Sequence, residues 1–176
     1  MTADRTLAPL ADLVDRLSAA TAALVELRPR VAAGEPWPLA PIYGAEPEAS
    51  WGPRELLAHL TEMLPYWLGE IERILEARAD GPVPFGRVQT DEMRIGVIGR
   101  DRTVPLRELH ARLAADSRRV GERLEELGKA DADRAGLHPR GVMTIREIVE
   151  RMIVGHLEGH VEQLLGILER DLPSAR

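Results

Sequence analysis

Four segments of this 176-residue chain repeat apolar residues at alternating spacings of three and four, the pattern of helices that bury one face. The first stripe consists of Leu10, Leu13, Leu17, Ala20, Leu24 and Leu27. The others lie within residues 53–74, 103–128 and 144–167. Aromatic residues, which favour strands, make up only 3% of the chain. We therefore predict an all-α fold, a four-helix bundle formed by one domain over residues 1–176.

Two of these helices carry start signals. Gly52 and Pro53 suit the N-cap and first helical position, and Thr144 with Glu147 forms a capping box. The connections over 36–50 and 80–102 are rich in Pro and Gly and exceed the usual helix–helix loop. Long connections permit crossovers, so the order of the helices stays open.

Composition argues against several classes of partner. The net charge is −6 without a basic block, which argues against nucleic acid binding. The absence of Cys excludes disulfides, thiolate metal ligands and a cysteine nucleophile. We expect no signal peptide, no membrane-spanning segment and a cytoplasmic location, because no apolar run is long enough.

Three of the five histidines fall on the apolar stripes, namely His59, His156 and His160. Residues four apart on a helix lie about 6 Å from each other at Cβ, and an imidazole binds zinc at roughly 2.0–2.1 Å. The three could thus hold one divalent metal ion and leave a position open. A buried histidine is nevertheless often a satisfied core residue, and the zincin motif is absent. We expect His110 at the boundary of the surface and His138 in a loop, neither with a role.

Weaker candidates for the surroundings of this site are Met63, Tyr66, Asp91 and Arg94. Tyr66 could offer a phenol, Asp91 a general base or hydrogen-bond acceptor, and Arg94 a partner for a substrate carboxylate. Each of these side chains could instead simply pack in the core or lie in a solvated loop. Glu62 is expected to point to solvent.

Two stretches resemble the DinB/YfiT-like superfamily. They are residues 51–60, which read Trp-Gly-Pro-Arg-Glu-Leu-Leu-Ala-His-Leu, and residues 141–160, from Gly-Val-Met-Thr-Ile to the His-x-x-x-His pair. The resemblance implies a four-helix bundle, a homodimer, and a metal site whose ligands match His59, His156 and His160. Nitrogen ligation suits Zn, Ni or Fe without selecting among them.

The resemblance also implies a metal-dependent enzyme that acts on a small-molecule substrate. The expected activity is an S-transferase that uses a low-molecular-weight thiol such as mycothiol, bacillithiol or glutathione, or a related isomerase or hydrolase. The alternative is a non-catalytic dimeric stress-response or binding module with a structural metal or none. An exchangeable ligand position beside a pocket would favour the enzyme, and a closed four-ligand site the module.

Overall fold

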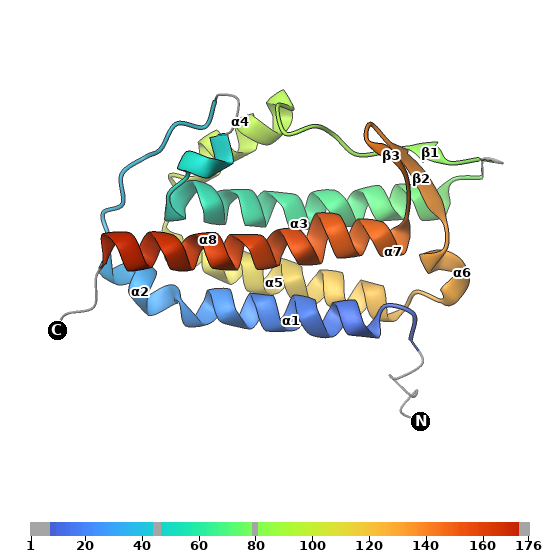
Figure 1. The fold of residues 1–176 in the computed structure, drawn as a ribbon, viewed down its shortest axis with the longest axis horizontal. Coiled ribbons are helices and arrows are strands. Elements are labelled where there is room, and N and C mark those ends of the chain that lie inside the picture. Colours follow the sequence, from blue (N-terminus) through green and yellow to red (C-terminus); the bar gives the residue numbers. More distant parts are fainter. Residues whose placement is uncertain (1–7, 44–46, 79–80, 173–176) are drawn as a thin grey trace.

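The computed structural model describes residues 8–43, 47–78 and 81–172. The expectation that the chain has no signal peptide rests in part on residues 1–7, which lie outside the described ranges. Within the described ranges, the long helices that form the bundle are α1 (Ala11–Glu26), α3 (Pro53–Glu76), α5 (Leu106–Glu125) and α8 (Gly155–Asp171) (Figure 1). The prediction of an all-α helical bundle is confirmed. None of the helices in these ranges is long and apolar enough to cross a membrane.

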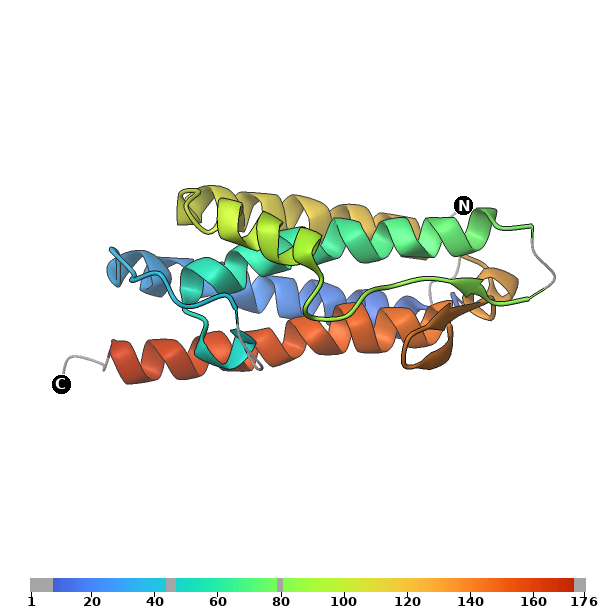
Figure 2. The same ribbon diagram turned by 90° about the horizontal axis from the view of Figure 1, so that it is seen from above.

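The order of the helices departs from a simple up-and-down bundle. Helix α1 packs beside α5 and α8, and α3 packs beside the same two helices. Figures 1 and 2 show that α1 and α8 run in one direction and α3 and α5 in the other. The chain after α3 therefore returns along the bundle before α5 begins. We call residues 81–91 of this connection the return segment. It lies over the face formed by α3 and α8 (Figure 2).

Shorter helices interrupt the connections. They are α2 (Arg28–Ala33), the 3-10 helix η2 (Pro47–Ser50), α4 (Glu92–Asp101) and α6 (Lys129–Ala132), whereas α7 (Ile145–Ile148) is the first turn of the last bundle helix. Helix α4 lies in the connection that was expected to be a loop. It begins at Asp91, whose carboxylate accepts a hydrogen bond from the Arg94 backbone N–H at 2.9 Å.

A small sheet that the sequence did not predict covers one end of the bundle. It contains β1 (Val83–Pro84), β2 (Ala135–His138) and β3 (Gly141–Thr144). Strand β1 pairs with β2 in parallel, and β2 pairs with β3 as an antiparallel hairpin. Strands of two to four residues are too short to produce a readable alternation, which is why the pattern missed them. The sheet joins the return segment to the hairpin that precedes the last helix.

The last helix begins where the capping box predicts. The Thr144 hydroxyl accepts the Glu147 N–H at 3.2 Å, and the Glu147 carboxylate accepts the Thr144 N–H at 2.7 Å. Between α7 and α8 the chain forms a π-helical segment, η3 (Val149–Val154), in which the Gly155 N–H bonds to the Glu150 carbonyl five residues back. The wider turn shifts the buried stripe by one residue. Ile153 is buried there, and Met152, which the regular spacing placed in the core, is only half-buried.

Candidate metal centre

The three histidines that the sequence singled out meet in the bundle interior. His59 comes from α3, and His156 and His160 come from successive turns of α8. The Nε2 atom of His156 lies 2.8 Å from Nε2 of His59 and 3.0 Å from Nε2 of His160. The ligand atoms of the group all lie within 4.8 Å of one another. This separation is small enough for the three rings to share one ion.

The tautomer of His160 is set by a chain of two hydrogen bonds. The Gln163 side-chain NH₂ donates to the Glu48 backbone carbonyl at 2.6 Å, which turns its Oε1 toward His160. Nδ1 of His160 lies 2.9 Å from that oxygen and must donate to it. The neutral ring therefore carries its proton on Nδ1, and Nε2 presents a bare lone pair to the other two histidines.

His59 has a carboxylate near its Nδ1 but no hydrogen bond to it. Its Nδ1 lies 3.8 Å from Oε2 of Glu62, and neither buried atom has a hydrogen-bond partner among the described residues. A proton on Nδ1 would face the Glu62 carboxylate and leave Nε2 bare. Trp51 packs against the His59 ring with the centroids 5.3 Å apart. An N–H directed at a carboxylate is the usual support of a histidine that binds a metal through its other nitrogen.

Burial keeps the three rings neutral. Desolvation is the main cause that lowers the pKa of His59 well below its usual value, with further contributions from His156 and Arg94. Desolvation, followed by His160 and Arg94, lowers the pKa of His156 to about 3. The pKa of His160 is also lowered, mainly by burial. Neutral imidazoles with facing lone pairs repel one another unless a proton or a cation lies between them, and this donor set suits a divalent ion.

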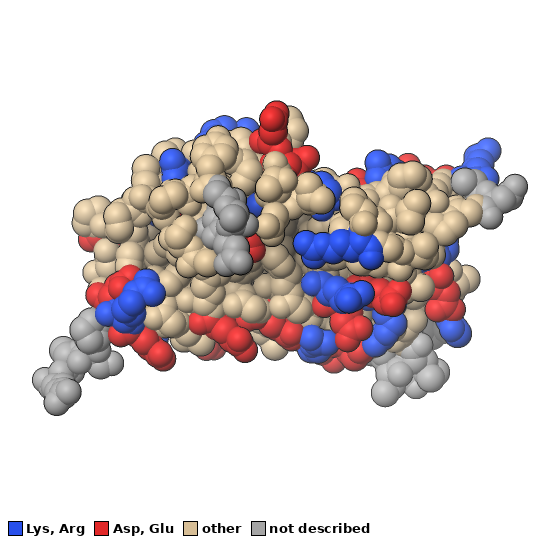
Figure 3. All heavy atoms as spheres, turned by 45° about the horizontal axis from the view of Figure 1, so that its top comes forward, with Lys and Arg blue, Asp and Glu red and all other residues tan. Residues whose placement is uncertain are grey.

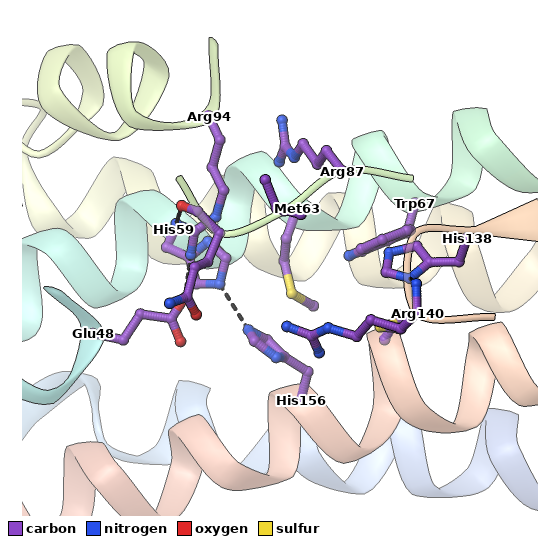
Figure 4. Close-up of a pocket in the computed structure, with 12 residues that line it drawn as sticks. Glu48, His59, Met63, Trp67, Arg87, Arg94, His138, Arg140 and His156 are labelled. Carbon is purple, nitrogen blue, oxygen red and sulfur yellow. Dashed lines mark hydrogen bonds and ion pairs between the residues drawn. The ribbon is translucent and has the colours of Figure 1, made fainter. Parts of the chain in front are cut away.

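A cavity of about 210 Å³ opens beside the histidines (Figure 4). Its lining consists of Glu48, His59, Met63, Trp67, Arg87, Val88, Gln89, Arg94, His138, Arg140, Met152 and His156. His59 and His156 line this cavity, whereas His160 is not among the residues that line it. A ligand in the cavity would therefore approach the histidine group from the side of His59 and His156.

The weaker sequence candidates divide into two groups. Met63 and Arg94 line the cavity. Tyr66 and Asp91 instead contact Arg87, whose guanidinium carbon lies 3.6 Å from the Tyr66 ring centroid and whose Nη1 lies 3.7 Å from the Asp91 carboxylate. Burial raises the pKa of Tyr66 to about 12, so its phenol stays protonated.

The cavity wall beside His59 is made of buried ion pairs. Arg94 is only 4% exposed, donates to the Glu48 carboxylate and to the Gln89 carbonyl, and stacks over Trp51. Arg87 donates to the Glu62 carboxylate. These two arginines are thus compensated by carboxylates. Arg87 links the connection after α3 back to α3, and Arg94 links α4 to η2.

Three expectations from the sequence were wrong. Glu62 is 9% exposed and faces His59 and Arg87 rather than solvent, because the return segment covers α3 at that point. His110 is 3% exposed instead of lying at the boundary, and its Nδ1 bonds to the Leu106 carbonyl at 2.9 Å. His138 lies in β2, is 3% exposed and lines the cavity. Glu62 and His138 are buried by segments that are distant in sequence, so no local pattern reveals their burial.

The hairpin contributes the end of the cavity opposite Glu48. His138 packs between Trp67 and Phe85, with ring centroids 6.2 Å and 5.4 Å away. Gly86, at a φ of +79°, lets the return segment pass so close that a Cβ there would lie 2.3 Å from the His138 ring. Arg140, at the hairpin turn, extends toward His156 (Figure 4).

Comparison with protein-family models matched residues 2–164 to the DinB superfamily. Comparisons with curated proteins and with solved structures found no match. The match covers α1, α3 and α5 and the first part of α8, which carries His156 and His160.

Proposed function

The chain belongs to the DinB superfamily, and from that premise we propose that it is an enzyme that binds a divalent metal ion, Zn, Ni or Fe, through His59, His156 and His160. The observation that supports this most directly is the arrangement of the three neutral rings. Nδ1 of His160 donates to Gln163 and Nδ1 of His59 lies 3.8 Å from the Glu62 carboxylate, an arrangement that favours Nε2 of both rings as the atom that binds a cation. The described residues supply three such ligands, and a cavity lies beside them.

A divalent ion at this position would supply a Lewis acid that lowers the pKa of a thiol or of water. The surrounding residues have supporting tasks. Glu62 would hold the proton on His59 Nδ1, and Gln163 would hold that on His160 Nδ1. Met63, Trp67 and Met152 supply the apolar part of a cavity lining that is otherwise largely polar.

We further propose that the reaction is transfer of a low-molecular-weight thiol to an electrophilic small molecule. In this reaction an S–C bond forms, the leaving group departs with its electron pair, and the thiol proton passes to solvent. The related isomerase and hydrolase reactions use the same site, the latter with water as the nucleophile. The described chain has no thiol of its own, since the sequence lacks Cys, and this is compatible with a thiol from solution. We propose a cytoplasmic location and a homodimer. Size-exclusion chromatography with light scattering would test the dimer.

The first experiment is the metal content of protein purified without chelators or an affinity tag. We expect nearly one metal ion per chain in the wild type and a loss of that metal in His156→Ala. His110→Leu is the matched control, because it removes a buried histidine from α5 outside the group. Circular dichroism verifies that all three proteins are helical.

The second measurement uses protein substituted with Co(II). Addition of a thiol should change the visible spectrum of the wild type and of His110→Leu, and the loss of free thiol in the presence of an electrophile should depend on His156. Wild-type protein that takes up no Zn, Ni or Fe would refute the metalloenzyme and leave a helical binding module. Metal that is bound but insensitive to thiols would contradict the transferase and favour the hydrolase.

A further inference from the structure

The charge of the cavity differs in sign from that of the whole chain. The sequence carries a net charge of −6, yet the cavity lining contains Arg87, Arg94 and Arg140 against a single carboxylate, Glu48. Figure 3 shows basic side chains beside the central hollow of this face, and acidic side chains along its lower edge. A cavity that gathers positive charge on an acidic protein favours an anionic ligand.

The three arginines are not equivalent. Arg94 is paired with Glu48, and Arg87 is paired with Glu62 and lies near Asp91. The guanidinium of Arg140 has no ion-pair or hydrogen-bond partner among the described residues, and only its backbone N–H is engaged, by His138 Nδ1 at 3.2 Å. Arg140 therefore supplies the positive charge that is available to a ligand.

The position of Arg140 directs this charge toward the histidine group. It lies at the turn of the β2–β3 hairpin, and its side chain extends along the cavity between His138 and His156 (Figure 4). The hairpin is held in place by β1 and by packing of His138 against Phe85. The base of the Arg140 side chain is thus fixed, and the cavity that it lines is also lined by the apolar side chains of Met63 and Met152.

We propose that Arg140 binds the carboxylate of a small ligand whose remaining atoms extend toward His156, so that the enzyme acts on, or with, carboxylate-bearing molecules. A guanidinium matches a carboxylate through two parallel hydrogen bonds. Met63, Met152 and Trp67, which line the same cavity, suit a short apolar chain. This inference deepens the proposed function and rests on it for the role of the histidine group, although the carboxylate site itself uses none of the histidines.

The first arm of the test needs no metal. Metal-free wild-type protein is titrated with succinate, and binding is followed by isothermal titration calorimetry. Arg140→Gln should weaken the affinity by at least about fivefold, since it removes a charge-assisted pair. Arg118→Gln is the matched control, because it removes an exposed arginine from α5 in a different groove with the same change in net charge. The control should bind as the wild type does.

The second arm uses Co(II)-loaded protein and two thiols of similar size. The wild type should bind 3-mercaptopropionate more tightly than 2-mercaptoethanol, as judged by the visible spectrum. Arg140→Gln should abolish that preference while it retains the response to 2-mercaptoethanol.

The two arms distinguish failure of the carboxylate site from failure of the proposed metalloenzyme. Succinate binding that is absent, or equal in Arg140→Gln and Arg118→Gln, would overturn the carboxylate site even if the metal is bound. Succinate binding that depends on Arg140 in a protein that takes up no metal would support the carboxylate site and refute the metalloenzyme. Arg140 is exposed at a turn, so the variant retains the fold, which circular dichroism verifies.

Discussion

At the scale of single residues, the site depends on side chains that orient the histidines as much as on the histidines. Position on an apolar stripe was enough to find His59, His156 and His160. Glu62 was missed although it lies only three residues after His59, because the partner that buries it, Arg87, comes from the return segment. The sequence contains the candidate ligands in a readable pattern, but the groups around them are assembled by tertiary contacts.

This dependence predicts the effect of removing the Glu62 charge. Glu62→Gln should weaken metal binding by about tenfold to a hundredfold, the usual cost of disturbing a group that orients a ligand. Competition with a chromophoric chelator measures the affinity. Glu158→Gln is the control, since Glu158 also neighbours His156 in sequence but pairs with Arg16 on the outer side of α8. Equal affinities in the two variants would exclude a role for Glu62 in positioning His59.

At the scale of elements, the π-helical segment decides which faces of the last helix point inward. The sequence predicted the helix and its capping box, because both depend on residues within a few positions. A regular 3.6-residue period cannot anticipate a wider turn, so the predicted stripe placed Met152 where Ile153 is buried. The small sheet was not predicted either, because its strands are short and because β1 and β2 pair across about 50 residues of sequence.

Two glycines of α8 provide a matched test of the π segment. A Cβ at Gly155 would lie 3.0 Å from the Glu150 carbonyl oxygen, whereas one at Gly159 would meet nothing within 4 Å. Gly159→Ala should therefore raise the free energy of unfolding by up to about 1 kcal/mol through helix propensity. Gly155→Ala should not raise the free energy of unfolding. It should lower metal affinity by about tenfold, because it alters the turn that positions His156. Urea unfolding and metal titration measure both quantities, and identical behaviour of the two variants would contradict the assignment.

At the scale of the whole molecule, buried histidines link stability to pH. Burial lowers the pKa of His110 below its ordinary value of 6.5, as it does for the three site histidines. In the unfolded chain these side chains take up protons near pH 6.5, but in the folded protein they remain neutral to lower pH. The unfolded state then binds more protons, so stability is full above pH 6.5 and is lost as the pH falls.

His110 allows this linkage to be measured away from the metal centre. In metal-free protein, His110→Leu should make the fall in unfolding free energy less steep by up to about 1.4 kcal/mol per pH unit, the contribution of one proton. Chemical denaturation at intervals from about pH 8 to pH 5 gives the slopes. Parallel curves for the variant and the wild type would show that His110 titrates normally in the folded protein.

The contact between Gln163 and the Glu48 carbonyl has a consequence for how the site tolerates mutation. The acceptor that turns the Gln163 amide, and thereby determines which nitrogen of His160 stays unprotonated, belongs to the main chain. Any amino acid at position 48 presents that oxygen as long as the backbone keeps its path. The side chain at position 163 therefore determines this tautomer, whereas the side chain at position 48 is left to its separate ion pair with Arg94.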